Sequence, residues 1–167
     1  MPLIQGKAWK FGDFISTDLI APGRYFHLRS NLAEFSKHVL EDANPDFARE
    51  VRPGDVVVAG KNFGLGSSRE HAPTIMKMAG VSAVVAESFS RIFFRNAVNI
   101  GLPVITAPAA GFIEEGDRVE IDLAAGILKN LSRGSQTTFN PLPPFMIQIL
   151  NDGGVVNTLI KNKGFCL

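Results

Sequence analysis

Apolar residues in the central part of this chain alternate between short β-branched runs and stretches with helical spacing. Residues 56–60, 83–86 and 103–105 form continuous apolar runs that predict buried strands. Between these runs, apolar positions three and four residues apart predict helices from about 70 to 79 and from 89 to about 99. Strands that alternate with helices form parallel sheets joined by right-handed crossovers. The pattern therefore predicts an α/β fold with a central, mostly parallel sheet flanked by helices.

The two ends of the chain add elements to this centre. Near the start, apolar and polar positions alternate over 6–11 like a half-buried strand, a polar loop follows over 16–25, and helical spacing over 31–40 predicts a helix. Ser30 or Asn31 is a plausible cap for that helix. Toward the end, the pattern predicts a β-hairpin over 118–123 and 126–130, followed by short helices over 145–150 and 155–160.

The composition limits the classes of function. The 167 residues are 46% hydrophobic, which suits a single domain over 1–167. Seventeen basic and sixteen acidic residues leave a net charge of +1, so no global field attracts nucleic acid or an anionic membrane. No apolar run approaches the ~20 residues that span a bilayer, which predicts a soluble, cytoplasmic protein. The lone Cys166 excludes an internal disulfide and a cluster or zinc site built from this chain's thiolates.

One segment gathers most of the reactive side chains. Two glycines, Gly64 and Gly66, allow positive φ angles and a close approach of a ligand to the backbone. Directly after them come two hydroxyls, a guanidinium, a carboxylate and an imidazole, in Ser67, Ser68, Arg69, Glu70 and His71. The segment lies between a predicted strand and a predicted helix, where backbone N–H groups converge. It is a candidate site for a small anion.

Two other interpretations of this segment are a capping box and a phosphate loop. Ser67 and Glu70 have the spacing of a capping box, which would give them a structural role. However, Pro73 is tolerated only in the first helical turn, so the helix is predicted to begin near Arg69 or Glu70 and to leave both serines in the loop. A phosphate loop is disfavoured, because the segment lacks the Gly-Lys-Ser/Thr ending that binds a nucleotide phosphate and its magnesium.

Taken together, the motifs resemble the small subunit of the 3-isopropylmalate dehydratase and homoaconitase family, which is similar to the swivelling domain of aconitase. The match covers the first two thirds of the chain. It comprises residues 9–13, 16–18, 22–25, 51–55, 60–64, 66–73, 87–96 and 99–103, in this order. The hairpin and the last helices carry no specific signature. The resemblance implies the swivelling β/β/α fold of the aconitase C-terminal domain.

The resemblance also implies a reaction. The family are hydro-lyases that isomerise a hydroxy dicarboxylate by reversible loss and re-addition of water, as in leucine biosynthesis. The 4Fe-4S cluster of such enzymes belongs to a separate large subunit, in keeping with the single cysteine here. The expected partner is therefore a cluster-bearing large subunit in a heterodimer or heterotetramer, and this chain alone should bind no cofactor or metal and be inactive.

The family's site residues map onto the glycine-rich segment and the polar loop. The resemblance makes Ser67 the base that removes a proton next to a carboxylate, and Arg69 the residue that binds a substrate carboxylate. A serine alkoxide needs stabilisation by nearby donors and positive charge. Ser68 and the loop amides from Gly66 onward could supply such donors. Thr17 and Asp18 match the polar loop that faces the cluster and substrate, although Asp18 could instead cap the turn before Pro22. Glu70 and His71 are expected to orient the loop rather than to react.

The residues after Tyr25 fit more than one substrate. In this family the residues after Tyr25 differ with the variable group of the substrate, and here they mix apolar and basic side chains: Phe26, His27, Leu28 and Arg29. An apolar lining suits an isopropyl group, whereas His27 or Arg29 would suit a further carboxylate. We place isopropylmalate first, homocitrate or homoisocitrate second, and citraconate or dimethylmalate third. A stand-alone anion-binding or regulatory module of the same fold is the alternative from another class.

Overall fold

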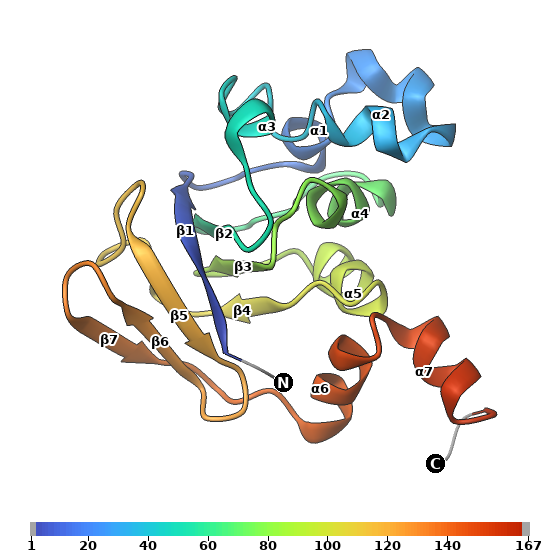
Figure 1. Cartoon of the computed structure of the whole chain (residues 1–167). Helices are drawn as coiled ribbons and strands as arrows, with labels where there is room; N and C mark the ends of the chain where they lie inside the picture. Colours follow the sequence, from blue (N-terminus) through green and yellow to red (C-terminus); the bar gives the residue numbers. More distant parts are fainter. Residues whose placement is uncertain (1–2, 165–167) are drawn as a thin grey trace.

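A seven-stranded mixed sheet lies at the centre of the computed structural model, which describes residues 3–164 (Figure 1). The strands lie in the order β4-β3-β2-β1-β5-β6-β7. Their bounds are β1 Ile4–Lys10, β2 Val56–Ala59, β3 Ala83–Ala86, β4 Val104–Thr106, β5 Arg118–Asp122, β6 Ile127–Asn130 and β7 Ser135–Thr138. The first four strands pair in parallel, with Trp9 opposite Val57 and Val57 opposite Val84. The predicted α/β class is confirmed, and β1 joins this parallel half to an antiparallel half through β5.

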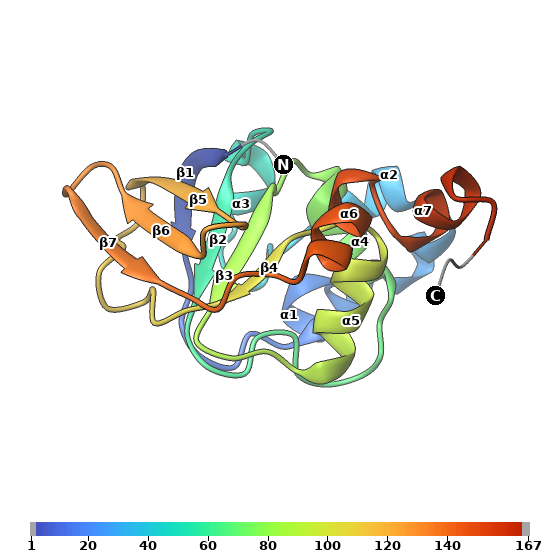
Figure 2. The ribbon, with the colours of Figure 1, turned by 90° about the horizontal axis from the view of Figure 1, so that it is seen from below.

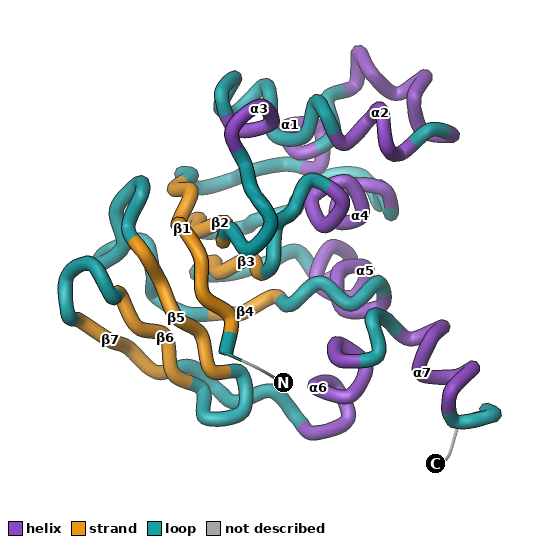
Figure 3. The backbone as a smooth tube through the Cα atoms, viewed as in Figure 1, coloured by secondary structure: helices purple, strands orange, loops and turns teal. Residues whose placement is uncertain are grey.

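Helices cover one face of the parallel half, and the antiparallel strands curl over the other (Figures 1 and 3). The helices are α1 Thr17–Ile20, the 3-10 helix η1 Gly23–Ser30, α2 Leu32–Ser36, α3 Phe47–Glu50, α4 His71–Met78, α5 Arg91–Asn99, α6 Pro144–Asn151 and α7 Val155–Lys161. Within residues 3–164, every helix is too short or too polar to cross a bilayer.

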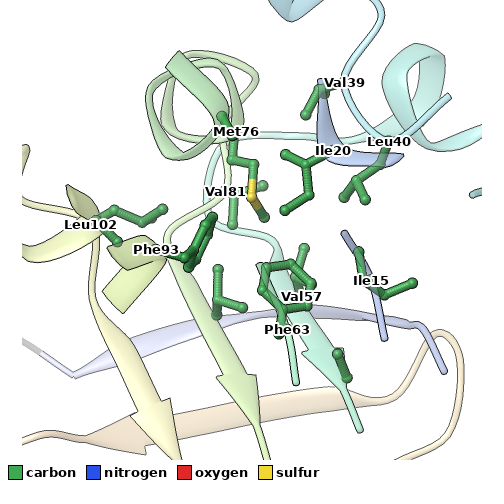
Figure 4. Packing of buried hydrophobic residues seen from close by; sticks show 14 of the residues in the cluster. Ile15, Ile20, Val39, Leu40, Val57, Phe63, Met76, Val81, Phe93 and Leu102 are labelled. Carbon is green, nitrogen blue, oxygen red and sulfur yellow. The ribbon is translucent and has the colours of Figure 1, made fainter. Parts of the chain in front are cut away.

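Two hydrophobic cores explain why the central strands are apolar throughout. Successive side chains of a strand point to opposite faces of the sheet. Val57 and Ala59 therefore point into the core beneath the helices, with Phe63, Ile75 and Phe93 (Figure 4). Their neighbours Val56 and Val58 point into a second core against β5 and β6, which includes Ile121 and Leu128. Burial on both faces is typical of parallel strands, which is why the pattern shows runs instead of alternation.

Several predicted elements differ in extent from those observed. The predicted helix over 31–40 ends at Ser36 as α2 and continues as hydrogen-bonded turns. The supposed polar loop over 16–25 contains α1 and the start of η1, because Ser16 caps α1 by accepting from the Leu19 N–H. The short α3 has no predicted counterpart. The hairpin gains a third strand, β7, whose sequence Ser135-Gln136-Thr137-Thr138 lacks the apolar alternation that would have revealed it.

The arrangement of the parallel strands decides where the site lies. All four parallel strands end at the same edge of the sheet, and the loops that follow β1, β2 and β3 gather there (Figure 2). Ligands of open α/β sheets bind at this carboxyl edge. The segment after β1 carries Thr17 and Asp18 at the start of α1, and the loop after β2 carries Ser67 and Arg69. Two segments fifty residues apart in sequence are thereby brought together.

Candidate active site

Backbone hydrogen bonds hold the loop after β1 against the loop after β2. The Gly64 N–H donates to the Ile15 carbonyl at 2.7 Å, and the Thr17 N–H donates to the Leu65 carbonyl at 2.8 Å. Ser16 and Leu65 form an isolated parallel bridge in the same stretch. The two loops therefore run side by side as an irregular extension of the β1 and β2 pairing. This extension carries Thr17 to the residue expected to act as the base, Ser67.

The Ser67 hydroxyl is exposed and lies between a threonine and an arginine. Arg69 donates from Nε to Ser67 Oγ at 3.1 Å. Thr17 Oγ1 donates to the Ser67 carbonyl at 3.1 Å and lies 3.5 Å from Ser67 Oγ. A guanidinium that donates to a hydroxyl oxygen favours the deprotonated form of that hydroxyl. The geometry therefore provides the nearby positive charge that a serine base requires.

The Arg69 guanidinium is anchored at each of its nitrogens. Besides the bond to Ser67, Nη1 donates to the Ala21 carbonyl at 2.8 Å, and Nη2 forms an ion pair with Asp18. The Arg69 side chain is 20% exposed, whereas that of Asp18 is 62% exposed. Asp18 thus lies on the open side of the guanidinium, where an incoming carboxylate would arrive. The Asp18 carboxylate pairs with Arg69, and the side-chain cap of α1 is Ser16.

Gly66 allows the loop after β2 to lie close to Thr17. Its φ of +109° lies in the region that favours glycine, and a Cβ atom there would come within 3.1 Å of Thr17 Oγ1. Among residues 3–164, the N–H groups of Ser67 and Ser68 donate no hydrogen bond. Helix α4 begins at His71 without a side-chain cap, so the capping box of Ser67 and Glu70 does not form. Both serines lie in the loop, as Pro73 predicts.

His71 lies behind the loop, between aromatic rings. Its ring stacks on Phe35 at 5.3 Å and tilts against Phe26 at 5.7 Å, measured between ring centroids. Burial, reinforced by the charge of Arg69, lowers the pKa of His71, while Glu70 has a smaller opposite effect. Its Nε2 atom is buried and has no hydrogen-bond partner. Glu70 accepts from the Thr74 hydroxyl through its carbonyl. Both residues support the start of α4.

The four residues after Tyr25 take different directions on η1. The Phe26 ring lies 5.6 Å from the Arg69 guanidinium carbon and 4.7 Å from that of Arg29, which also donates to the Phe26 carbonyl at 3.3 Å. Leu28 packs against the core beneath the helices, and His27 is exposed. Phe26 and Arg29 therefore border the site more closely than Leu28 does.

Sequence reasoning missed two contributors to this arrangement. The Ala21 carbonyl positions Arg69, and the Phe35 ring packs on His71. A backbone carbonyl leaves no signal in the sequence, and a phenylalanine with helical spacing indicates only a core position. The first contact depends on the turn between α1 and η1, which contains Ala21, and the second on the packing of α2 against α4.

The described residues offer no ligand set for a metal cluster. Within residues 3–164, no group of three or more His, Cys, Asp or Glu side chains could hold a metal ion. The one cysteine, Cys166, lies outside the described residues. The donor set of this site, with hydroxyls, a guanidinium and one exposed carboxylate, suits an organic anion better than an iron-sulfur cluster.

The sequence and the fold are similar to those of known proteins. The family model described as the aconitase C-terminal domain matches residues 22–110. The 3-isopropylmalate dehydratase small subunit 1 of Thermotoga maritima is 61% identical over 98% of both chains. The methanogen homoaconitase small subunit of Methanothermobacter thermautotrophicus is 53% identical over 95% of this chain and 92% of that one. The crystal structure of 3-isopropylmalate dehydratase from Methanocaldococcus jannaschii superposes with a TM-score of 0.91 at 41% identity, covering 97% of this chain and 96% of that one.

These similarities define the class, an α/β domain of the aconitase C-terminal type. The chain belongs to the family of 3-isopropylmalate dehydratase and homoaconitase small subunits. The predicted family, fold and hydro-lyase subunit class are thereby confirmed. A small subunit implies a large-subunit partner.

Proposed function

We propose that this chain supplies the proton-transferring serine and the carboxylate-binding arginine of a 3-isopropylmalate dehydratase. The observation that carries the proposal is the 3.1 Å bond from Arg69 Nε to Ser67 Oγ. Through this bond the Arg69 guanidinium, which is suited to bind a substrate carboxylate, also makes the Ser67 hydroxyl easier to deprotonate. Relatives named for 3-isopropylmalate dehydratase, at 61% and 57% identity, support this substrate. The single-domain extent over 1–167 and a cytoplasmic location stay predictions.

In the proposed reaction, Ser67 acts as an alkoxide and takes a proton from the carbon next to the substrate carboxylate. The electron pair of that C–H bond forms the double bond as hydroxide leaves the neighbouring carbon. Hydration reverses these steps with the hydroxyl on the other carbon, and Ser67 returns the proton. Arg69 and the free N–H groups of Ser67 and Ser68 would offset the negative charge during proton transfer.

A substrate carboxylate must compete with Asp18 for Arg69. Asp18 lies on the exposed side of the guanidinium, so a carboxylate that approaches from solvent meets the Arg69 and Asp18 pair first. Thr17, held against Ser67, keeps the loop in register while this exchange takes place. We assign Thr17, Asp18, Gly66, Ser68 and Arg29 to the substrate side of the site, and Glu70 and His71 to the support of its loop.

The proposal includes a partner that completes the site. When bound on the large subunit, a 4Fe-4S cluster would supply the Lewis acid that assists departure of the hydroxyl. Residues 3–164 contain no group of three or more His, Cys, Asp or Glu side chains that could hold it, and we assign the cluster to the partner. The stand-alone anion-binding module would have no need of that partner, and co-purification with a cluster-bearing chain would distinguish the two.

Ser67→Ala tests the proposal. In the reconstituted pair, this variant should lose several orders of magnitude in turnover while the fold and subunit association stay intact, because it removes the base but little volume. Ser68→Ala should cost less, about 10- to 1000-fold, because it removes the Ser68 hydroxyl as a donor to the developing charge but keeps the Ser68 N–H. Wild-type turnover by Ser67→Ala would refute the role of Ser67, and a larger loss in Ser68→Ala would reverse the two assignments.

Homoaconitase activity is the second candidate, favoured by the 53% identical homoaconitase small subunit. Arg29 beside Phe26 offers a cation for an additional substrate carboxylate. Steady-state assays of the reconstituted pair on isopropylmalate and on homocitrate or homoisocitrate would decide between the two. Methylated malates are the third candidate.

A further inference from the structure

Phe14 is both strained and exposed. Its φ of +59° lies in the left-handed region, which is unfavourable for a residue with a Cβ atom. Its side chain is nevertheless 58% exposed, so this conformation places an aromatic ring in solvent. Both features lower the stability of the folded chain when it is not bound to a partner. A single exposed apolar side chain needs no explanation, but one held outward by an unfavourable backbone conformation does.

The loop that contacts Phe14 contains a second residue with a positive φ angle. The Phe14 N–H donates to the Lys61 carbonyl at 2.7 Å, and the next residue, Asn62, also has a positive φ, of +58°. Asn62 in turn donates from its N–H to Ser88 Oγ at 2.8 Å. Within residues 3–164, only four residues other than glycine have positive φ, and two of them lie side by side here. Asparagine tolerates this conformation, so the strain is that of Phe14, and such strain persists where the surroundings impose it, commonly at functional sites.

An apolar cavity lies beside these residues. It has a volume of about 410 Å³ and is lined by Ser88, Phe89, Arg91, Phe94 and Thr106. Ser88, the residue that accepts from Asn62, forms part of its wall. This edge of the sheet therefore carries the exposed Phe14 ring, the two adjacent loops that contain Phe14 and Asn62, and the cavity lined by Phe89 and Phe94. Exposed aromatic side chains and the pockets that accept such side chains are typical hot spots of protein interfaces.

We propose that Phe14 is a docking anchor for the large subunit, and that the interface continues over Asn62 into the cavity of Phe89 and Phe94. This inference rests on the proposed function and names the surface that its partner covers. The argument for this occupant is continuity with the candidate active site. The segment that carries Phe14 runs beside the β2 loop as far as Thr17, which contacts Ser67. A partner that brings a Lewis acid to Ser67 must cover this edge.

The test uses the full chain and its purified, cluster-bearing large subunit under anaerobic conditions. Phe14→Asn removes the ring and places a residue that tolerates positive φ at this position. Its affinity for the large subunit should fall about 30-fold or more, as for an interface hot spot, measured by isothermal titration calorimetry. The urea midpoint of the variant chain alone should equal or exceed that of wild type. Phe14→Tyr, which keeps the ring, should retain the wild-type affinity within about threefold, well inside one kcal/mol.

Phe145→Asn is the matched control, because Phe145 is 63% exposed but lies on α6, outside these loops. It should leave the affinity unchanged. At saturating large subunit, Phe14→Asn should recover the wild-type kcat, since the substitution leaves Ser67 in place. An unchanged affinity of Phe14→Asn for the large subunit would overturn the inference and leave the proposed function intact. The same holds if Phe14→Asn weakens only the association of this chain with a second copy of itself. Failure of the wild-type chain to bind the large subunit would overturn both.

Discussion

The Nε atom of Arg69 donates a hydrogen bond of 3.1 Å to the hydroxyl of Ser67, two residues earlier in the same loop. The same guanidinium is fixed from the other side by the Ala21 carbonyl and by Asp18. One side chain thereby ties the loop after β2 to the turn after α1. It also places a permanent positive charge beside the Ser67 oxygen that is proposed as the base.

Arg69→Lys is predicted to impair catalysis nearly as strongly as Arg69→Gln. Lysine keeps the charge but has no planar fork to bond Ser67, Ala21 and a carboxylate together. Loss of one charge-assisted hydrogen bond, roughly 1.5 to 3 kcal/mol, corresponds to a fall in kcat/KM of about 10- to 150-fold. Misplacement of Ser67 would add to this loss. Wild-type kcat/KM in Arg69→Lys would contradict the role of the guanidinium.

Arg29→Ala is predicted to change substrate preference and spare the chemistry. Arg29 contacts the Phe26 ring but makes no bond to Ser67 or Arg69 among residues 3–164. If Arg29 binds a distal carboxylate, its removal should lower kcat/KM for homocitrate or homoisocitrate more than for isopropylmalate. Steady-state kinetics on both substrates measure this ratio. An equal reduction for all substrates would show that Arg29 supports the site as a whole.

Gly66→Ala is predicted to lower turnover while the chain still folds. The new Cβ would lie 3.1 Å from Thr17 Oγ1 and push apart the two loops that position Ser67. Gly116→Ala is the control, because Gly116 also has a positive φ, of +84°, but a Cβ there has no atom within 4 Å. Both variants should show similar losses of stability in urea, and only Gly66→Ala should lose activity. Equal activities would show that the contact with Thr17 is unimportant.

The stability of the chain is predicted to fall as the pH drops below about 6.5, in part through His71. Burial lowers the pKa of His71 in the folded state, so the unfolded chain binds a proton more readily than the folded chain does. The stabilisation is therefore present above the unfolded pKa and is lost as the pH falls toward the folded value. Urea unfolding at pH 8 and pH 5 measures the change.

His71→Leu is the comparison for this pH dependence, since the ring lies between Phe26 and Phe35 and its buried Nε2 has no partner to lose. The variant should lose less stability than wild type between pH 8 and pH 5. An identical loss in both chains would assign the pH dependence to other groups.

The sequence by itself determined the parallel half of the fold. Val56 to Val58 and Ala83 to Ala86 are apolar on both faces, because helices cover one side and β5 and β6 the other. Pro73 located the start of α4 near Glu70, since a proline fits only the first helical turn. By contrast, β7 was not predictable, because its polar residues pair through backbone hydrogen bonds that do not depend on side-chain pattern.

For the site, the sequence by itself determined the segment in which the candidate residues lie, and the tertiary structure decided how these residues meet. Ser67 and Arg69 follow the glycines within one segment, which marks a candidate anion site, but their separate roles come from the family resemblance and stay predictions. That Arg69 bonds the Ala21 carbonyl and pairs with Asp18 depends on β1 and β2 lying in parallel register, which brings residues about fifty positions apart into contact. Local sequence encodes loop chemistry and helix starts, but contacts between loops arise only when the sheet aligns the strands that carry them.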